Sequence, residues 1–265
     1  MRLAWLSDIH LNFLTTAEAA SFFAEVRAQK PDAVLLTGDV GEARSVVPWL
    51  EWMVDVMLRP IYFVLGNHDY YGGSIAGVRA DVAELCRRRD WLIYLTQQNI
   101  VELTPNVGLV GDDGWADGRL GNYERSLVMM NDYRLIAELA PFSKRERLDM
   151  LHQLGDTAAA HVRRVLPQAL KEYQHVVFAT HVPPFRESCW HEGQLSDDEW
   201  LPHFTCKAVG DAILEIMRTT PERQLTVYCG HTHSPGIYQP LPNVVIHTSG
   251  AKYGQPSLQR VIEVE

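Results

Sequence analysis

Short apolar runs alternate with longer amphipathic segments along most of the chain, and this alternation predicts the fold. The apolar runs predict β-strands at residues 3–6, 33–37, 61–65, 107–110, 176–180, 225–229, 244–247 and 260–264. Between several of these runs, the apolar positions recur at helical spacing and predict helices over residues 16–29, 46–57, 75–89 and 207–218. Strands that alternate with helices are typical of an α/β protein whose helices pack over the faces of its sheets.

Residues 112–173 depart from this alternation. They begin with the Gly- and Asp-rich stretch "GDDGWADGRLGN" and continue as largely helical sequence. The chain contains no internal repeat or flexible linker, and 265 residues are enough for one large domain with a substantial core. We therefore expect a single domain, residues 1–265, with a loop and helical insertion at about 112–173.

Five of the predicted strands end in polar residues of the kinds that bind metals. The clusters are "SDIH" (7–10), "TGDV" (37–40), "GNHD" (66–69), "ATH" (179–181) and "CGHTH" (229–233). In open α/β sheets, ligands bind at the carboxyl ends of the strands. The sequence therefore predicts that the five clusters converge on one site.

The spacing within the clusters fits metal binding. Asp8 and His10 are two residues apart, so an extended backbone projects both from the same face. Gly38, Gly66 and Gly230 let the backbone turn sharply at three of the strand ends. Imidazoles combined with carboxylates suit Mn, Fe, Zn or Co, whereas Mg and Ca favour oxygen ligands alone. The donors exceed the needs of one ion, which indicates two metals about 3.5–4 Å apart that share a bridging carboxylate.

Taken in order, the clusters resemble the motifs of the calcineurin-like metallophosphoesterases, in the broad bacterial-type branch of small hydrolases. The family pattern D-x-H, G-D, G-N-H-[DE], a lone His and G-H-x-H occurs between Asp8 and His233. A single such block is usually a turn or a helix cap, but five in order at strand ends favour a catalytic site. The resemblance implies two stacked mixed β-sheets flanked by helices, a four-layer sandwich with the metals at the sheet edges.

The resemblance also implies a role for each motif residue. The implied ligands are Asp8, His10 and His233 for the first metal, Asn67, His181 and His231 for the second, and Asp39 as the bridge. His68 matches the catalytic His of the family, and Asp69 its partner carboxylate. Two divalent ions leave the pocket positive although the protein has a net charge of -9. The metals would activate a bridging water for in-line attack, and His68 would protonate the leaving oxygen or stabilise its charge.

The expected function is thus a metal-dependent phosphoesterase for a small phosphomonoester or phosphodiester. A nuclease is one alternative, since "GNHD" and "GHTHSP" also resemble nuclease members of the family, but the acidic charge and the lack of a basic stripe count against nucleic acid. A partner-binding scaffold that keeps the fold, as in a retromer subunit of this family, is another. Such scaffolds typically lose metal ligands or the catalytic His, and all of these are present here.

Two departures from the family narrow the substrate. The G-D motif continues as "GDVGEAR" where protein phosphatases have V-D-R-G, and the lone His is followed by "VPPF". We therefore expect phosphoproteins to be poor substrates. No apolar run reaches the roughly 20 residues of a membrane span, and the amino terminus does not resemble a signal peptide, so we expect a cytoplasmic location without membrane contact.

Several other residues have two possible roles, packing in the core or contact with the substrate. His191 and His203 follow His181 in an irregular stretch and are candidates for substrate contact. The loop and the segment after His181 add aromatic and polar candidates: Trp115, Arg119, Asn122, Tyr123, Phe185, Arg186 and Trp190. Trp49 and Trp52, at helical spacing, are expected in the core.

Overall fold

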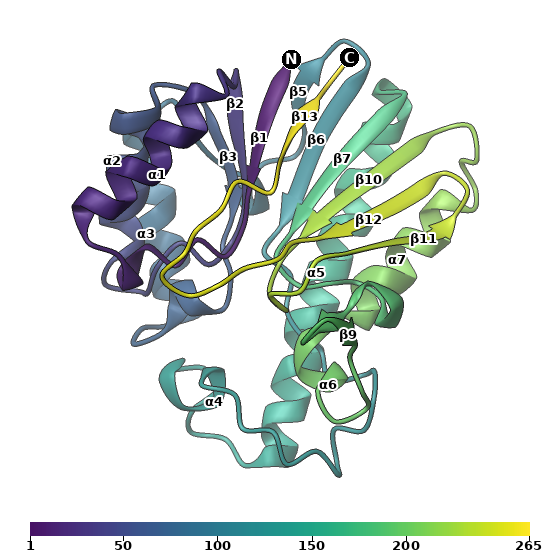
Figure 1. The fold of residues 1–265 in the computed structure, drawn as a ribbon. Helices are drawn as coiled ribbons and strands as arrows, with labels where there is room; N and C mark the ends of the chain where they lie inside the picture. The colour runs from purple at the N-terminus through teal and green to yellow at the C-terminus, as the bar shows by residue number, and fades with distance from the viewer.

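The computed structural model describes residues 1–265 and consists of two mixed β-sheets packed face to face with helices on their outer faces (Figure 1). The first sheet has the order β13-β1-β2-β3-β4, with strands β1 (Arg2–Leu6), β2 (Ala33–Thr37), β3 (Ile61–Val64), β4 (Leu92–Tyr94) and β13 (Arg260–Glu263). The second has the order β11-β12-β10-β7-β6-β5, with strands β5 (Val101–Thr104), β6 (Val107–Asp112), β7 (His175–Thr180), β10 (Gln224–Cys229), β11 (Gly236–Leu241) and β12 (Val244–Thr248). The predicted α/β class with two mixed sheets is confirmed.

Seven α-helices and a small hairpin complete the fold. The helices are α1 (Thr16–Ala28), α2 (Val46–Met57), α3 (Ile75–Arg88), α4 (Asp132–Leu135), α5 (Lys144–Glu172), α6 (Leu201–Phe204) and α7 (Lys207–Met217). The hairpin pairs β8 (Trp190–His191) with β9 (Gln194–Leu195). Every predicted strand and helix is present, with ends within two residues of the predicted ones. None of the helices has the length and apolarity needed to cross a membrane.

The alternation of side chains along the strands builds the layers. In β1, Leu3 and Trp5 point into the core between the two sheets, where they meet residues of the second sheet such as Val177. The neighbouring Ala4 and Leu6 face the opposite way, into the core shared with α1, α2 and α3. A third core joins the outer face of the second sheet to α5 and α7. The sequence of layers is therefore helix, sheet, sheet, helix.

The directions of the strands bring the polar strand ends of both sheets to one place in the molecule. Strands β1, β2, β3 and β4 are parallel, as are β6, β7, β10 and β12. The two sheets meet at their carboxyl ends, because Asp8 after β1 accepts a hydrogen bond from the backbone N–H of His231 after β10 at 2.9 Å. The side chain of His181 after β7 likewise lies 2.8 Å from the carbonyl oxygen of Thr37 in β2.

The segment at 112–173 connects the parallel strands β6 and β7. Its long helix α5 packs on both strands and on α7, as the crossover between two parallel strands must. The part before α5, which includes α4, lies with α6 beyond the carboxyl ends of the strands (Figure 1). The division of the chain into one domain with an insertion stays a prediction.

Asp113 is a buried acceptor that ties the two sheets together beside this edge. Its carboxylate accepts a hydrogen bond from the backbone N–H of Leu65, after β3. It also accepts hydrogen bonds from the side chains of Tyr70, Tyr94, Thr96 and Arg79. Its backbone carbonyl accepts the N–H of His181 at 3.0 Å, so one residue links β3, β4, β6 and β7.

We expect Asp113→Ala to lower the free energy of unfolding by about 3 kcal/mol, because it leaves Arg79 and several buried hydroxyls without an acceptor. Urea denaturation followed by circular dichroism measures this. Asp55→Ala is the control, since Asp55 pairs with Arg89 on the surface of α2 and its loss should cost less than about 1 kcal/mol. Equal effects of the two substitutions would contradict the role of Asp113.

Candidate metal centre

The strand ends deliver their polar side chains from an unusual backbone conformation. The left-handed region is occupied by Asp8 (φ 50), His10 (φ 42), Asp39 (φ 55), His231 (φ 73) and His233 (φ 58). Residues other than glycine rarely adopt this conformation, which costs about 1–3 kcal/mol and tends to occur at functional sites. Only eight non-glycine residues of the chain have positive φ, and five of them belong to the expected ligand set.

At two of the strand ends, Gly66 and Gly230, neighbouring side chains leave no room for a Cβ atom. Gly38 has a φ of +90 and supplies the expected turn. Gly66 and Gly230 do not have positive φ, but a Cβ at Gly66 would lie 2.1 Å from Oδ1 of Asp39, and one at Gly230 would lie 2.2 Å from Oδ2 of Asp8. The carboxylates thus rest directly on the backbone of the neighbouring strand end.

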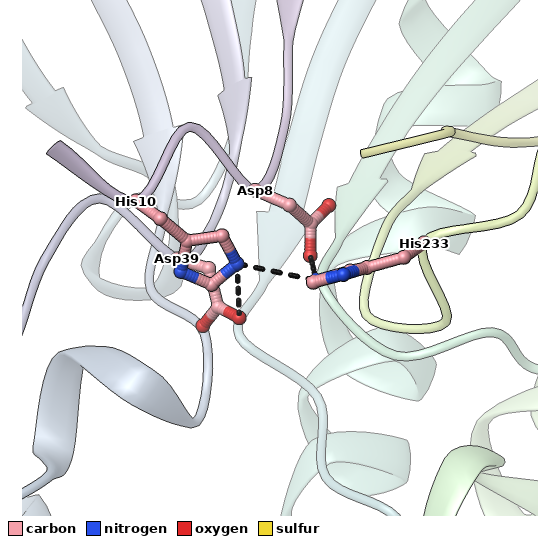
Figure 2. Close-up of side chains that lie close together, drawn as sticks. All are labelled: Asp8, His10, Asp39 and His233. Carbon is pink, nitrogen blue, oxygen red and sulfur yellow. Dashed lines mark hydrogen bonds and ion pairs between the residues drawn. The ribbon is translucent and has the colours of Figure 1, made fainter. Parts of the chain in front are cut away.

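The first group of donors consists of Asp8, His10, Asp39 and His233, whose ligand atoms all lie within 4.8 Å of one another (Figure 2). Nε2 of His10 is 3.1 Å from Nε2 of His233, which in turn is 3.5 Å from Oδ1 of Asp8. Nδ1 of His10 is buried and has no hydrogen-bond partner. Side chains that follow β1, β2 and β10 therefore point at one small volume.

The second group gathers around the amide oxygen of Asn67. Oδ1 of Asn67 lies 3.0 Å from Nε2 of His181 and 2.9 Å from Nδ1 of His231. The amide is held in this orientation because its Nδ2 donates to Asp132 at 2.9 Å and to the hydroxyl of Tyr71 at 3.1 Å. Asp132 belongs to α4, so the segment at 112–173 fixes a residue of the site.

The tautomers of both histidines are set by backbone carbonyls. Nδ1 of His181 faces the carbonyl oxygen of Thr37 at 2.8 Å, and Nε2 of His231 faces that of His203 at 3.0 Å. A proton on each of these nitrogens leaves a lone pair on the other, and both lone pairs face the lone pairs of the Asn67 oxygen. Three acceptor atoms without a hydrogen between them fit a bound cation.

Asp39, which belongs to the first group, also faces the second group. Its Oδ1 is 3.5 Å from Nε2 of His181, and its Oδ2 is 3.7 Å from Nε2 of His10. Burial and the charges of Asp8 and Asp69 raise the pKa of Asp39 well above its usual range. The protein by itself therefore disfavours the ionised form of this carboxylate, which a bound cation would favour.

Two of the imidazoles in the expected ligand set, those of His10 and His231, are kept neutral by burial. Burial lowers the pKa of His10 and that of His231 to about 3. For His233, burial also lowers the pKa, but the hydrogen bond and charge of Asp8 outweigh it and raise the pKa above its ordinary value. Conversely, although burial opposes it, the pKa of Asp8 is lowered by His233 and the other nearby histidines. Neutral imidazole is the form that binds metals.

His68 lies beside the two groups and lines a cavity of about 390 Å³ together with Asp39, Asn67 and His233. Its ring centroid is 4.3 Å from that of Tyr71 and 4.6 Å from that of His10. Burial lowers the pKa of His68 to about 2. Its backbone N–H donates to Oδ1 of Asp39 at 2.9 Å, so His68 is anchored to the centre while its ring faces the cavity.

Asp69 has different partners from those that we expected. The resemblance implied that its carboxylate orients the ring of His68. The carboxylate instead accepts hydrogen bonds of 2.8–3.0 Å from four backbone N–H groups, those of Asp39, Val40, Gly41 and Gly66. The reason is the 3₁₀ turn His68–Tyr70, which rotates successive side chains by about 120° and turns Asp69 into the interior. Burial, opposed by these hydrogen bonds, raises the pKa of Asp69 to about 6.

Tyr253 occupies the place beside His68 that we had assigned to Asp69. Its hydroxyl lies 3.4 Å from Nε2 of His68, and its ring contacts those of His10 and His233. Tyr253, Tyr71 and Asp132 were not predicted as site residues from the sequence. Only Tyr71 carried a local signal, because it closely follows "GNHD".

Of the other candidate residues, His191 lies at the cavity and the rest lie elsewhere. His191 lines the cavity, and His203 is buried, where its ring contacts the hydroxyls of Ser126 and Tyr133. None of the remaining candidates lines the cavity: Trp115, Tyr123 and Phe185 are in the cores, Arg119 pairs with Asp117 and Asp156, Arg186 pairs with Asp198, Asn122 accepts the backbone N–H of Arg125 at 3.2 Å, and the ring of Trp190 lies against Gly236. Trp49 and Trp52 pack against the first core, as predicted.

Residues 1–235 match the family model of the calcineurin-like phosphoesterases. The chain therefore belongs to the calcineurin-like phosphoesterase family, a family of metal-dependent hydrolases. No curated protein matches the sequence.

Solved structures share the fold at low sequence identity. The phosphopantetheinyl hydrolase of Mycobacterium tuberculosis is 17% identical with a TM-score of 0.62, over 94% of this chain and 89% of that one. A dimetal phosphatase from Danio rerio is 14% identical with a TM-score of 0.58, over 94% and 87% of the two chains. A Thermus thermophilus protein is 12% identical with a TM-score of 0.56, over 94% and 88%.

We expect Asp132→Ala to weaken metal binding at the Asn67 group about 10- to 100-fold, because it frees the amide that aims Oδ1 at His181 and His231. Calorimetric titration of Mn²⁺ into chelator-treated protein measures this. Asp211→Ala, which removes an exposed partner of Lys207 on α7, is the control and should leave the titration unchanged. An unaltered titration of a folded Asp132→Ala protein would show that the amide needs no such support.

Proposed function

We propose that this protein is a dinuclear metal-dependent phosphoesterase that hydrolyses a small phosphomonoester or phosphodiester. The observation that carries the proposal is the position of Asp39, whose two oxygens face separate donor groups at 3.5 and 3.7 Å. A carboxylate between two sets of nitrogen and oxygen donors is suited to bridge two cations. The first ion would be held by Asp8, His10 and His233, the second by Asn67, His181 and His231, and both by Asp39.

The donor set suits Mn, Fe, Zn or Co, since four of the seven ligands are imidazoles. When bound, two such ions would polarise the phosphoryl oxygens of the substrate and lower the pKa of a water molecule enough for it to attack phosphorus. Asp69 would keep the Asp39 loop in place through its four backbone hydrogen bonds. A location in the cytoplasm remains part of the proposal.

His68 is the residue that we assign to the leaving group. Its ring faces the cavity, and its backbone N–H is fixed on Asp39. From there the N–H of its neutral ring would donate a hydrogen bond that stabilises the charge on the leaving oxygen as the ester bond breaks. Tyr253, whose hydroxyl is 3.4 Å from Nε2, and Tyr71, whose ring lies against the imidazole, would hold the ring in this position.

The two alternatives have less support. A nuclease would need cations along the path of the nucleic acid, whereas no Lys or Arg lines the cavity and the net charge is -9. A partner-binding scaffold would not need seven donors whose lone pairs face one another in a buried site.

We expect the purified protein to hydrolyse p-nitrophenyl phosphomonoesters or phosphodiesters when Mn²⁺ is added, and to lose this activity with a chelator, because the ligand set binds transition metals. Phosphoproteins should be turned over more slowly than the best small ester, since the V-D-R-G continuation is absent. A spectrophotometric screen with matched phosphoprotein assays tests both points. Activity that survives complete metal removal would refute the proposed function.

Two substitutions separate metal binding from leaving-group chemistry. Asp39→Ala removes the carboxylate between both donor groups, so metal content and activity should be lost together. His68→Ala should retain its metals but lose activity about 10²- to 10⁴-fold, most strongly on alkyl esters, since the charge on an aryl leaving oxygen needs little stabilisation. Metal analysis and rates on alkyl and aryl esters measure these effects.

His152→Ala is the control for the loss of an imidazole, because His152 lies on α5 outside the cavity. It should match the native protein in metal content and in rate. If His68→Ala loses its metals as Asp39→Ala does, His68 is a ligand and its assigned role is wrong.

A further inference from the structure

An apolar surface continues outward from the candidate metal centre. Residues 127–130 read "LVMM" and follow one another in irregular backbone between β6 and α4. Leu127 is 89% exposed and Met129 52% exposed. These residues line a second cavity of about 500 Å³, which shares His68, Met130 and Tyr253 with the cavity at the metal centre. The two cavities therefore adjoin at these three residues.

The exposure of this stretch does not come from a lack of anchoring. Nζ of Lys144 donates to the backbone carbonyls of Glu124 and Ser126 at 2.9 and 2.7 Å, immediately before the stretch. The backbone N–H of Leu127 donates to Glu199 at 3.2 Å. The apolar side chains are thus held toward solvent by a fixed backbone, which is typical of a binding surface.

Aromatic side chains extend the apolar surface on both sides. Trp200 lines the second cavity together with residues 127–130. Beside the metal centre, Phe13 and Tyr253 are 52% and 50% exposed, and their ring centroids lie 5.0 Å apart. Singly exposed apolar residues are normal on protein surfaces, but a contiguous set around a polar site marks a place where an apolar group binds.

The charges around both cavities limit what the substrate can carry. No Lys or Arg lines either cavity, whereas Glu192 lines the first and Glu199 the second. A substrate with one phosphoester group would be neutralised by the bound metals. A second phosphate or a carboxylate on the same molecule would find no cationic side chain and would be repelled by the two glutamates.

We infer that residues 127–130, Trp200 and Tyr253 form an apolar groove that binds an uncharged alkyl or aryl group attached to the phosphoester. This inference rests on the proposed function, and it names the substrate class as a phosphoester of a hydrophobic alcohol or phenol without a second anionic group. His68 stands at the junction of the two cavities, so the ester bond lies at the metal centre while the apolar group lies in the groove.

The test compares the binding of two probes that share a headgroup. Methylphosphonate and hexylphosphonate carry the same phosphonate, and only the second has a chain long enough to reach the groove. Each fully buried methylene strengthens binding by up to about fourfold, so five of them in a half-open groove should give at least about tenfold tighter binding of hexylphosphonate. Calorimetry on the Mn²⁺-loaded protein measures both dissociation constants.

Variants assign the effect to the groove. The double variant Leu127→Ser and Met129→Ser alters exposed side chains, so it should fold, and we expect it to reduce the affinity ratio to less than about threefold. The control is Leu58→Ser, which removes an equally apolar, 55% exposed side chain at the end of α2 and should keep the native ratio. Equal affinities of the native protein for the two phosphonates would overturn the inference, as would tighter binding of thymidine 5′-monophosphate than of hexylphosphonate.

A kinetic arm distinguishes this inference from the proposed function. Methyl phosphate and hexyl phosphate both release a simple primary alcohol, and hydrolysis of either breaks the bond from phosphorus to the alkyl oxygen, adds water and frees inorganic phosphate, which is measured. A higher kcat/KM for the hexyl ester, lost in the double variant, supports both proposals. Equal hydrolysis of the two esters would overturn the groove and leave the phosphoesterase intact. Tight hexylphosphonate binding with no hydrolysis of either alkyl ester or of the p-nitrophenyl monoesters and diesters would support the groove and refute the phosphoesterase.

Discussion

The four backbone N–H groups that converge on the carboxylate of Asp69 are the constraint on which the centre depends. They come from the loop after β2 and from Gly66 after β3, so one buried side chain joins two strand ends. This loop carries Asp39 in its left-handed conformation, and Asp39 in turn accepts the N–H of His68. Asp8 does the equivalent across the sheets by accepting the N–H of His231. Carboxylates that accept hydrogen bonds from backbone N–H groups, those of Asp69 and Asp8, thus position the loops whose other side chains face the cavity.

The segment before α5 has a larger part in the site than its sequence indicates. Through Asp132 it orients Asn67, and through residues 127–130 it forms one wall of the groove. The sandwich therefore provides the metal donors, while an irregular loop attached to it completes their orientation and shapes the surroundings. Because the donors and the surrounding loop are separate parts of the chain, the loop can change substrate specificity without disturbing the strands that hold the reactive groups.

The elements and the polar clusters at the strand ends were predictable because their signals are local. An apolar run followed by Asp, His or Asn marks a strand end wherever it occurs, and the five clusters repeat that signal. The strands that were missed have weaker patterns: β4 has three residues, β8 and β9 have two each, β5 is an edge strand with no buried position, and β11 contains Pro240 and also has no buried position. Contacts distant in sequence were not predictable. Asp132 and Asn67 are 65 residues apart in the sequence, and Tyr253 and His68 are 185 apart. No local motif near Asp132 or Tyr253 indicates either contact. The side chain of Asp69 points into the interior because of one 3₁₀ turn, and the spacing of residues in the motif does not predict that turn.

The left-handed backbone at five ligand positions has a consequence for how such a sequence evolves. Each of these residues costs about 1–3 kcal/mol that glycine would not. Replacement by glycine at Asp8, His10 or His231 would thus relieve backbone strain while deleting a donor. A lineage released from selection for catalysis would gain stability by discarding its ligands, since strained functional positions trade stability for activity. The five positions accordingly hold a local cost in stability in exchange for the direction in which they aim their donors.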